Sequence, residues 1–324
     1  MKTIFQTVTA VGMLTLSSSA FANIIMVGDY IQTQISDDGT LGEGRSRPGL
    51  QYDPTGTGSF DPNLDYIAPG TPFEGFGVRY EGSGLLENRN SVSDGGVGSG
   101  EDFLFTSLTD MSASSIFDNY VTWAGSARNG SMSIIHEFFF NDDDERINIL
   151  TSITANIDLI GLQFARAVDP DPDNNPGGSA VTANQRGIDN NSDGDTTDVG
   201  DVAAENFVGS IGTISGQPLG LFADTDFVQN TGIVFDCCSV TDPLRYLSGG
   251  DLSSSTADDG IGIAFELGNL LAGNTVSVNY AYVMGGSLAT IDLPDNPTTD
   301  VPAPSGIALF GLALLAISRK LKKK

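Results

Sequence analysis

The sequence predicts an all-β protein, an antiparallel β-sandwich built as one large sandwich or two smaller ones, with long acidic and Gly/Pro-rich loops and a C-terminal hydrophobic helix. Its apolar stretches are short and are separated by turn residues, among 40 glycines and 14 prolines in 324 residues. Several stretches alternate apolar and polar residues, which is the period of a half-buried strand. Before the C-terminal segment, no region carries a sustained helical stripe, so short strands joined by turns are the expected architecture.

The clearest strands are expected between residues 131 and 168. Three apolar runs occur there, at 131–140 (SMSIIHEFFF), 146–157 (RINILTSITANI) and 159–168 (LIGLQFARAV), and an Asn-Asp-Asp-Asp turn separates the first two. The second run alternates between apolar and polar residues at most of its positions. We expect a three-strand antiparallel meander that delivers the acidic residues following it to one edge of a sheet.

The other elements follow from shorter patterns. A first strand is expected at 24–31, and the irregular region 36–100 is interpreted as ordered and packed on the sheet, because a disordered linker would be poor in aromatic residues. Trp123 is expected in the core. Further strands are expected at 102–110, 120–124, 209–215 and 231–236.

The last strand pair of the body is expected between residues 260 and 286. Two alternating runs flank a turn bracketed by Gly268 and Gly273. This strand, turn and strand resembles the closing hairpin of Ig-like or larger β-sandwich domains of bacterial surface proteins, and the resemblance is short and generic.

The N-terminus has the pattern of a signal peptide over residues 1–22. Lys2 precedes an apolar run, and Ala20 and Ala22 fit the A-x-A cleavage rule. The mature chain would then begin at Asn23, with a β-sandwich body over 23–291. The alternative is an ordinary buried strand or helix at the N-terminus.

The C-terminus predicts a membrane anchor. Residues 292–305 form a Pro/Thr/Asp linker, 306–318 a short transmembrane helix and 319–324 a basic tail. The tail would stay in the cytoplasm by the positive-inside rule. A plain C-terminal anchor is one interpretation of this segment.

A second interpretation comes from the residues Val301, Pro302 and Pro304, which precede the hydrophobic helix and the basic cluster. This arrangement resembles the PEP-CTERM sorting signal of Gram-negative bacteria, although Ala303 stands where glutamate is commonest. The resemblance covers residues 301–324 alone. It implies export, anchoring in the inner membrane, processing by an exosortase-type enzyme, and a final place at the cell surface or outside the cell, often with exopolysaccharide or biofilm.

The charge of the chain excludes one class of partner. The net charge is −26, and every lysine lies in the two terminal segments, so arginine is the only strong base of the body. Nucleic acid is not expected as a partner, because binding it requires a basic surface. Divalent cations are the natural complement of such an acidic body.

A calcium site is expected in the loop at 189–201. Short oxygen-bearing side chains stand at alternate positions, and Gly194 occupies the sixth position, where calcium loops turn sharply. The pattern resembles the first half of an EF-hand or dockerin-type loop, but Gly200 replaces the bidentate acid. The alternative is a solvated acidic loop that binds nothing tightly. The expected ligands are Asp189, Asn191, Asp193, Asp195, Asp198 and Asp201.

A second alternating set, Asp169, Asp171 and Asp173, is a further group of expected calcium ligands. The two cysteines, Cys237 and Cys238, are adjacent, which leaves a vicinal disulfide, two free thiols or a bond to another molecule.

The sequence shows no catalytic constellation, so the chain is expected not to be an enzyme. The only histidine, His136, alternates in phase with Ile134 and Phe138, which indicates a packed strand position. The motifs of serine hydrolases, P-loop proteins and dinucleotide-binding proteins are absent from the sequence. We therefore expect an exported, calcium-stabilised envelope or matrix protein with a structural or adhesive role. The alternatives are a carbohydrate-binding module that uses the aromatic loops at 50–80, and a glycan-degrading enzyme.

Overall fold

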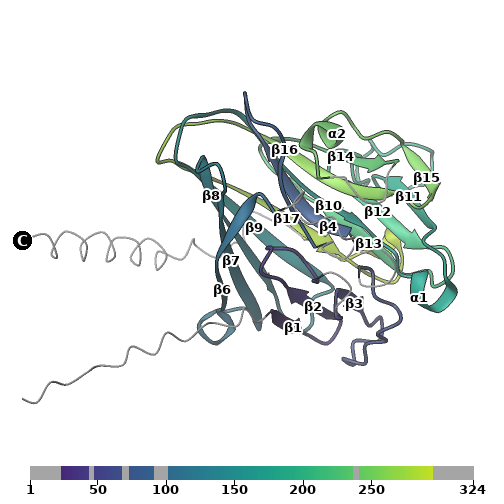
Figure 1. Ribbon diagram of the computed structural model, residues 1–324. Coiled ribbons are helices and arrows are strands. Elements are labelled where there is room, and N and C mark those ends of the chain that lie inside the picture. The colour runs from purple at the N-terminus through teal and green to yellow at the C-terminus, as the bar shows by residue number, and fades with distance from the viewer. Residues whose placement is uncertain (1–22, 44–46, 68–72, 91–100, 236–240, 295–324) are drawn as a thin grey trace, which may run out of the picture.

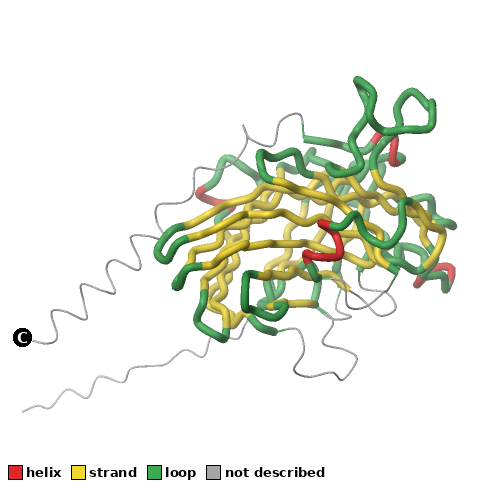
Figure 2. The backbone as a smooth tube through the Cα atoms, turned by 90° about the horizontal axis from the view of Figure 1, so that it is seen from above, coloured by secondary structure: helices red, strands yellow, loops and turns green. Residues whose placement is uncertain are grey.

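The computed structural model describes residues 23–43, 47–67, 73–90, 101–235 and 241–294. Antiparallel strands dominate this part of the chain, as Figures 1 and 2 show, and the few helical turns lie outside the strands. The expectation of an all-β sandwich is confirmed. The predicted signal peptide, C-terminal helix and sorting motif, and the two cysteines, lie outside the described residues.

The strands form three sheets. The nine-stranded sheet has the order β15 (Ser254–Ala257), β11 (Thr182–Arg186), β12 (Phe207–Gly212), β13 (Pro218–Phe222), β17 (Thr275–Val283), β9 (Arg146–Ala155), β8 (Met132–Phe140), β7 (Asn119–Ala127) and β6 (Phe103–Asp110). The five-stranded sheet has the order β14 (Val228–Val234), β16 (Gly260–Leu270), β10 (Leu159–Asp169), β4 (Phe73–Arg79) and β5 (Leu86–Arg89). The three-stranded sheet consists of β1 (Ile24–Val27), β2 (Ile31–Ile35) and β3 (Leu50–Tyr52).

The main core lies between the nine-stranded and the five-stranded sheets. Ring contacts join them directly, because the ring centroids of Phe164 on β10 and Tyr280 on β17 are 5.8 Å apart. Trp123 has no exposed surface and stacks on His136, with ring centroids 5.3 Å apart. The expected core positions of Trp123 and His136 are therefore confirmed.

The predicted meander is only half right. β8 and β9 form an antiparallel hairpin, with Ile134 opposite Ile153, but β10 leaves this sheet and pairs with β4 and β16 in the other one. The neighbour of β9 on its free side is β17. Since strands of both sheets bury one face in the same core, local alternation does not distinguish a third meander strand from a strand that crosses to the opposite sheet.

The predicted closing hairpin is wrong for the same reason. β16 pairs with β10 and β14, whereas β17 pairs with β9 and β13, so the turn between them passes from one sheet to the other. Both strands occur where they were expected. Their partners are distant in sequence.

The region at 36–100 contributes more strand than its sequence indicated. Its described part contains β3, β4 and β5, and β4 lies inside the five-stranded sheet. Most of its aromatic side chains are buried, as the core interpretation expected. The buried ones are Tyr52, Tyr66, Phe73 and Phe76.

A short helix, α2 (Pro243–Leu247), covers the outer face of the five-stranded sheet. Its Tyr246 is fully buried against small residues, among them Ala165 and Ala264. A Cβ at Gly262 would lie 2.3 Å from Cζ of Tyr246, so only glycine leaves room for this ring. The other helical turns are η2 (Ser112–Ser114), α1 (Asn174–Gly177) and η3 (Leu288–Thr290). Among the described residues, no helix has the length and apolar character needed to span a membrane.

Candidate metal centre

Three aspartates from separate segments converge at one end of the five-stranded sheet. Asp169 ends β10, Asp171 follows two residues later, and Asp258 lies just before β16. β10 and β16 are antiparallel neighbours with Val168 opposite Ile261, so the end of β10 lies beside the start of β16. One oxygen from each aspartate lies within 4.8 Å of one from each of the others. We call these residues the aspartate cluster.

Two of these side chains are almost wholly buried. Asp169 is 3% and Asp171 is 4% exposed, whereas Asp258 is exposed to solvent. Oδ2 of Asp171 accepts a hydrogen bond from Nδ2 of Asn174 at 3.1 Å, and its Oδ1 is buried without a hydrogen-bond partner. Asp259, next to Asp258 in the chain, is 1% exposed, and its Oδ2 is also buried without a hydrogen-bond partner. A buried carboxylate oxygen that lacks a donor is costly, so each calls for a compensating partner, such as a water molecule or an ion.

The electrostatics of the aspartate cluster favour a cation. Burial and, to a smaller extent, the Asp258 carboxylate raise the pKa of Asp171 to about 7, against the lowering effect of the Asn174 hydrogen bond. Burial and the neighbouring Asp259 raise the pKa of Asp258. None of the ion pairs formed among the described residues involves Asp171, Asp258 or Asp259. A divalent ion would supply the missing positive charge and would accept the oxygens as ligands.

Asp173, the third member of the predicted second set, lies apart from this convergence. Its carboxylate accepts hydrogen bonds from the backbone N–H groups of Ile214 at 2.6 Å and Ser215 at 2.9 Å. It thereby fixes the turn between β12 and β13 and is fully buried. The sequence did not predict that Asp258, and not Asp173, would be the third member of the cluster. The only signal was an acidic pair directly before an alternating strand.

The loop at 189–201 brings together part of the predicted ligand set. Oxygens of Asp193, Asp195 and Asp198 lie within 4.8 Å of one another, and all three residues are exposed. The loop projects between β11 and β12, and its ends are joined by the bridge between Ile188 and Val202.

The other predicted ligands of this loop hold its backbone. Asp189 accepts hydrogen bonds from the N–H groups of Ser192 at 2.6 Å and Gly194 at 2.9 Å. Asp201 accepts one from Asn190 N at 2.9 Å. Nδ2 of Asn191 donates to Asp198 Oδ2 at 3.0 Å, so this amide faces the acidic group with its donor.

Two surface pockets complete the candidate sites. A pocket of about 280 Å³ is lined by Arg79, Tyr80, Gln163 and neighbouring residues, and Arg79 is held there by a bidentate ion pair with Asp242 at 2.7 Å. A second pocket, of about 370 Å³, contains four carboxylates at the β6 edge of the nine-stranded sheet. Tyr80, which is half-buried, is among the residues that line the first pocket.

No protein-family model matches the chain, and no curated protein matches it in sequence. A bacterial glucoamylase complexed with acarbose is similar in structure, with a TM-score of 0.52 and 11% identity over 82% of this chain and 32% of the glucoamylase. This chain therefore spans about a third of that enzyme. A protein from Escherichia coli K12 that is described as an aldose 1-epimerase has a TM-score of 0.34 and 12% identity over 84% of this chain and 99% of that one. An α-galactosidase from Geobacillus stearothermophilus has a TM-score of 0.37 and 9% identity over 82% and 40%.

The glucoamylase likeness corrects one expectation from the sequence. The absence of recognisable motifs led us to expect that the chain is not an enzyme, but its fold occurs within an enzyme. At 11% identity the likeness establishes the fold and assigns no residue a role. Catalytic groups are recognised by their geometry and roles and not by sequence position, so the absence of short motifs is a poor test for activity.

Proposed function

We propose that this chain is an exported envelope or extracellular-matrix protein whose β-sandwich is stabilised by calcium and whose role is structural or adhesive. The observation that carries the proposal is the convergence of Asp169, Asp171 and Asp258, with a buried oxygen of Asp171 lacking any donor. Calcium takes six to eight oxygen ligands and tolerates irregular geometry, which suits carboxylates supplied by separate loops.

The ion would cross-link the end of β10 to the connection that precedes β16. Asp169 and Asp171 lie at the end of β10, and Asp258 lies in the connection between β15 and β16. Neutralising their charges would remove mutual repulsion and the cost of burial together. Because the ligands come together only in the folded chain, calcium would stabilise the native state by mass action.

Thermal unfolding of the full-length chain in EDTA and in millimolar calcium tests this proposal. At a calcium concentration of 100 times Kd, one site adds about 2.7 kcal/mol to the free energy of unfolding. Asp171→Asn should reduce the shift strongly. Glu266→Gln, at an exposed position on β16, removes the same charge and should leave the shift unchanged. Equal melting temperatures in EDTA and calcium would overturn the proposal.

The route to the cell surface is proposed from the chain termini. The signal-peptide pattern at 1–22 and the PEP-CTERM-like residues Val301, Pro302 and Pro304 support export and sorting by an exosortase-type enzyme. Fractionation of cells that express the chain with and without Pro302→Ala and Pro304→Ala tests this route. Identical surface delivery would leave the segment as a plain anchor.

A carbohydrate ligand is a second candidate function, favoured by the fold shared with a glucoamylase that binds acarbose. The pocket of about 280 Å³ is lined by the half-buried Tyr80 together with Arg79 and Gln163, and sugars bind to such mixtures of aromatic and polar residues. Glycan-array binding that Tyr80→Ala abolishes would support it. Binding that persists in this variant would place the glycan elsewhere.

A further inference from the structure

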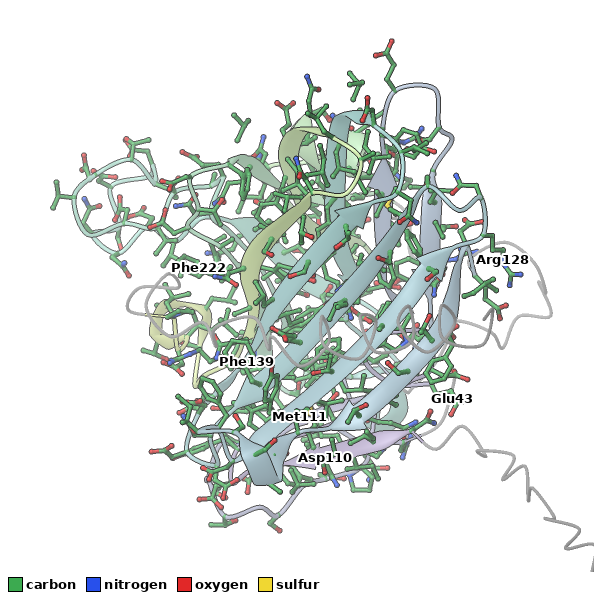
Figure 3. The ribbon with its side chains drawn as sticks, turned by 90° about the vertical axis from the view of Figure 1, so that its left-hand side faces the viewer. Glu43, Asp110, Met111, Arg128, Phe139 and Phe222 are labelled. Carbon is green, nitrogen blue, oxygen red and sulfur yellow. The ribbon has the colours of Figure 1, made fainter. Side chains whose placement is uncertain are left out.

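The pocket of about 370 Å³ at the β6 edge is lined by two kinds of surface. Four carboxylates face it, from Asp37, Asp38, Glu43 and Glu101. The start of β6 adds an apolar strip, in which Leu104 is 46% exposed and Phe105 is half-buried. Figure 3 shows Glu43 and Arg128, another lining residue, at the same margin of the sheet. The volume lies within the range of about 300–1,000 Å³ found for pockets that hold small ligands.

The positively charged residue that lines this pocket, Arg128, is already paired with one of the carboxylates. Nη2 of Arg128 lies 3.4 Å from Oε2 of Glu101, and its Nε donates to the backbone oxygen of the same residue. Glu43 accepts a hydrogen bond from the amide of Asn23. Among the described residues, the Asp38 carboxylate has neither a hydrogen bond nor an ion pair, since only its backbone is bonded, to Ser36 and Asn88. Within the described part of the chain, three of the four carboxylates, those of Asp37, Asp38 and Glu43, therefore form no ion pair with a cationic side chain.

The carboxylates of the pocket repel one another. Burial, together with the carboxylates of Asp37, Glu101 and Glu43 in that order, raises the pKa of Asp38 to about 7. Burial and Glu43 also raise the pKa of Asp37. A bound cation would relieve this repulsion and would draw Asp38 into its ionised form.

The spacing of the carboxylates distinguishes a metal ion from a larger cation. No three of them bring oxygens within 4.8 Å of one another, whereas the aspartate cluster and the 189–201 loop each do. A calcium ion needs convergent oxygens at about 2.3–2.6 Å, so it fits the pocket poorly. An ammonium group on a carbon skeleton can reach separate carboxylates with its three donors and can lay its apolar surface on β6.

We propose that this pocket binds a small organic cation, with a primary ammonium group held between Asp38, Asp37 and Glu43 and its carbon skeleton against Leu104 and Phe105. The pocket shares no residue with the aspartate cluster, so the proposal is independent of calcium binding. Amino sugars and aliphatic diamines both carry this chemistry.

Isothermal titration of the full-length chain near pH 7.5 tests the proposal, with glucosamine, glucose, putrescine and calcium chloride as probes at constant ionic strength. Glucosamine or putrescine should bind, and glucose should bind at least about tenfold more weakly, because a charge-assisted hydrogen bond is worth about 1.5–3 kcal/mol. Asp38→Asn should weaken the amine about tenfold. Glu266→Gln should leave its affinity unchanged.

Each outcome bears on the proposal. Preference for glucosamine over putrescine identifies an amino sugar, and the reverse identifies a diamine. Equal binding of glucose and glucosamine overturns the proposal, as does amine binding that survives both Asp38→Asn and Asp37→Asn. Calcium binding that depends on Asp38 would replace the organic cation with a metal ion. If Asp38→Asn alters the circular dichroism spectrum of the chain, the same titration is made with Asp37→Asn in its place.

The pH dependence supplies a readout that a purely structural role of Asp38 would not move. Putrescine stays protonated between about pH 5.5 and 8, so its affinity should rise over this range as Asp38 ionises. In the described part of the chain, the other charged groups around Asp38 are Asp37, Glu43, Glu101 and Arg128. In Asp38→Asn the rise should flatten.

Discussion

Arg166 and Glu74 form an ion pair in the core, with Nη2 of Arg166 donating to Oε2 of Glu74 at 2.9 Å and neither side chain exposed. They lie on neighbouring strands, β10 and β4. Glu74 also accepts hydrogen bonds from Tyr282 Oη at 2.7 Å and from the backbone N–H of Leu41 at 2.7 Å. The pair thus links the five-stranded sheet to β17 of the nine-stranded sheet and to the loop after β2.

Replacing Arg166 by methionine should destabilise the fold by about 3–5 kcal/mol, because it leaves the Glu74 carboxylate buried and unpaired. The double variant Arg166→Met, Glu74→Gln should lose less than the sum of the two single variants, since it removes both charges. Urea unfolding of the three variants measures this. Strict additivity would show that the two side chains act independently.

His136 predicts a loss of stability in mild acid. Burial, together with the positive charge of Arg166, lowers its pKa well below the ordinary value, and its Nδ1 lies 2.8 Å from the hydroxyl oxygen of Thr151. The unfolded chain takes up a proton near pH 6.5 that the folded chain does not. The stability contribution is therefore full above pH 6.5 and is lost as the pH falls, by about 1.4 kcal/mol per unit. His136→Phe should flatten the slope between about pH 6.5 and 5, and an unchanged slope would contradict the assignment.

Asp173 and Asp171 should behave differently although only Pro172 separates them. Asp173→Ala removes the acceptor for Ile214 N and Ser215 N, so it should cost about 1–3 kcal/mol with or without calcium. The calcium-induced shift in melting temperature should persist in this variant. A variant that loses the shift would place Asp173 among the ligands.

The exposed loop at 189–201 should add a second, weaker calcium effect. Asp193→Ala removes one of three convergent carboxylates, so it should reduce the calcium-dependent stability only in part, with the aspartate cluster still present. Calorimetric titration should then show one fewer site. Unchanged stoichiometry in Asp193→Ala would make this loop a solvated acidic loop.

The sequence anticipated the class of the fold and the burial of particular side chains. Alternation at 146–157 predicted β9, and the phase of His136 with Ile134 and Phe138 predicted its place in the core, because side-chain direction in a strand is a local property with a period of two residues. The acidity of the body was equally plain. In the loop at 189–201 the sequence predicted Asp189 as a calcium ligand, whereas the structure shows it accepting hydrogen bonds from nearby backbone N–H groups.

The pairing of strands was decided only by the tertiary structure. Nothing local distinguishes β10 as a partner of β4 and β16 from β10 as a third meander strand, since either place buries the same face. For the same reason Asp258 was not foreseen beside Asp169, nor Glu101 beside Asp37. Local patterns determined which residues are buried and which turns form, because these depend on neighbours along the chain. The sites depend on which strand ends meet, and long-range packing alone decides that.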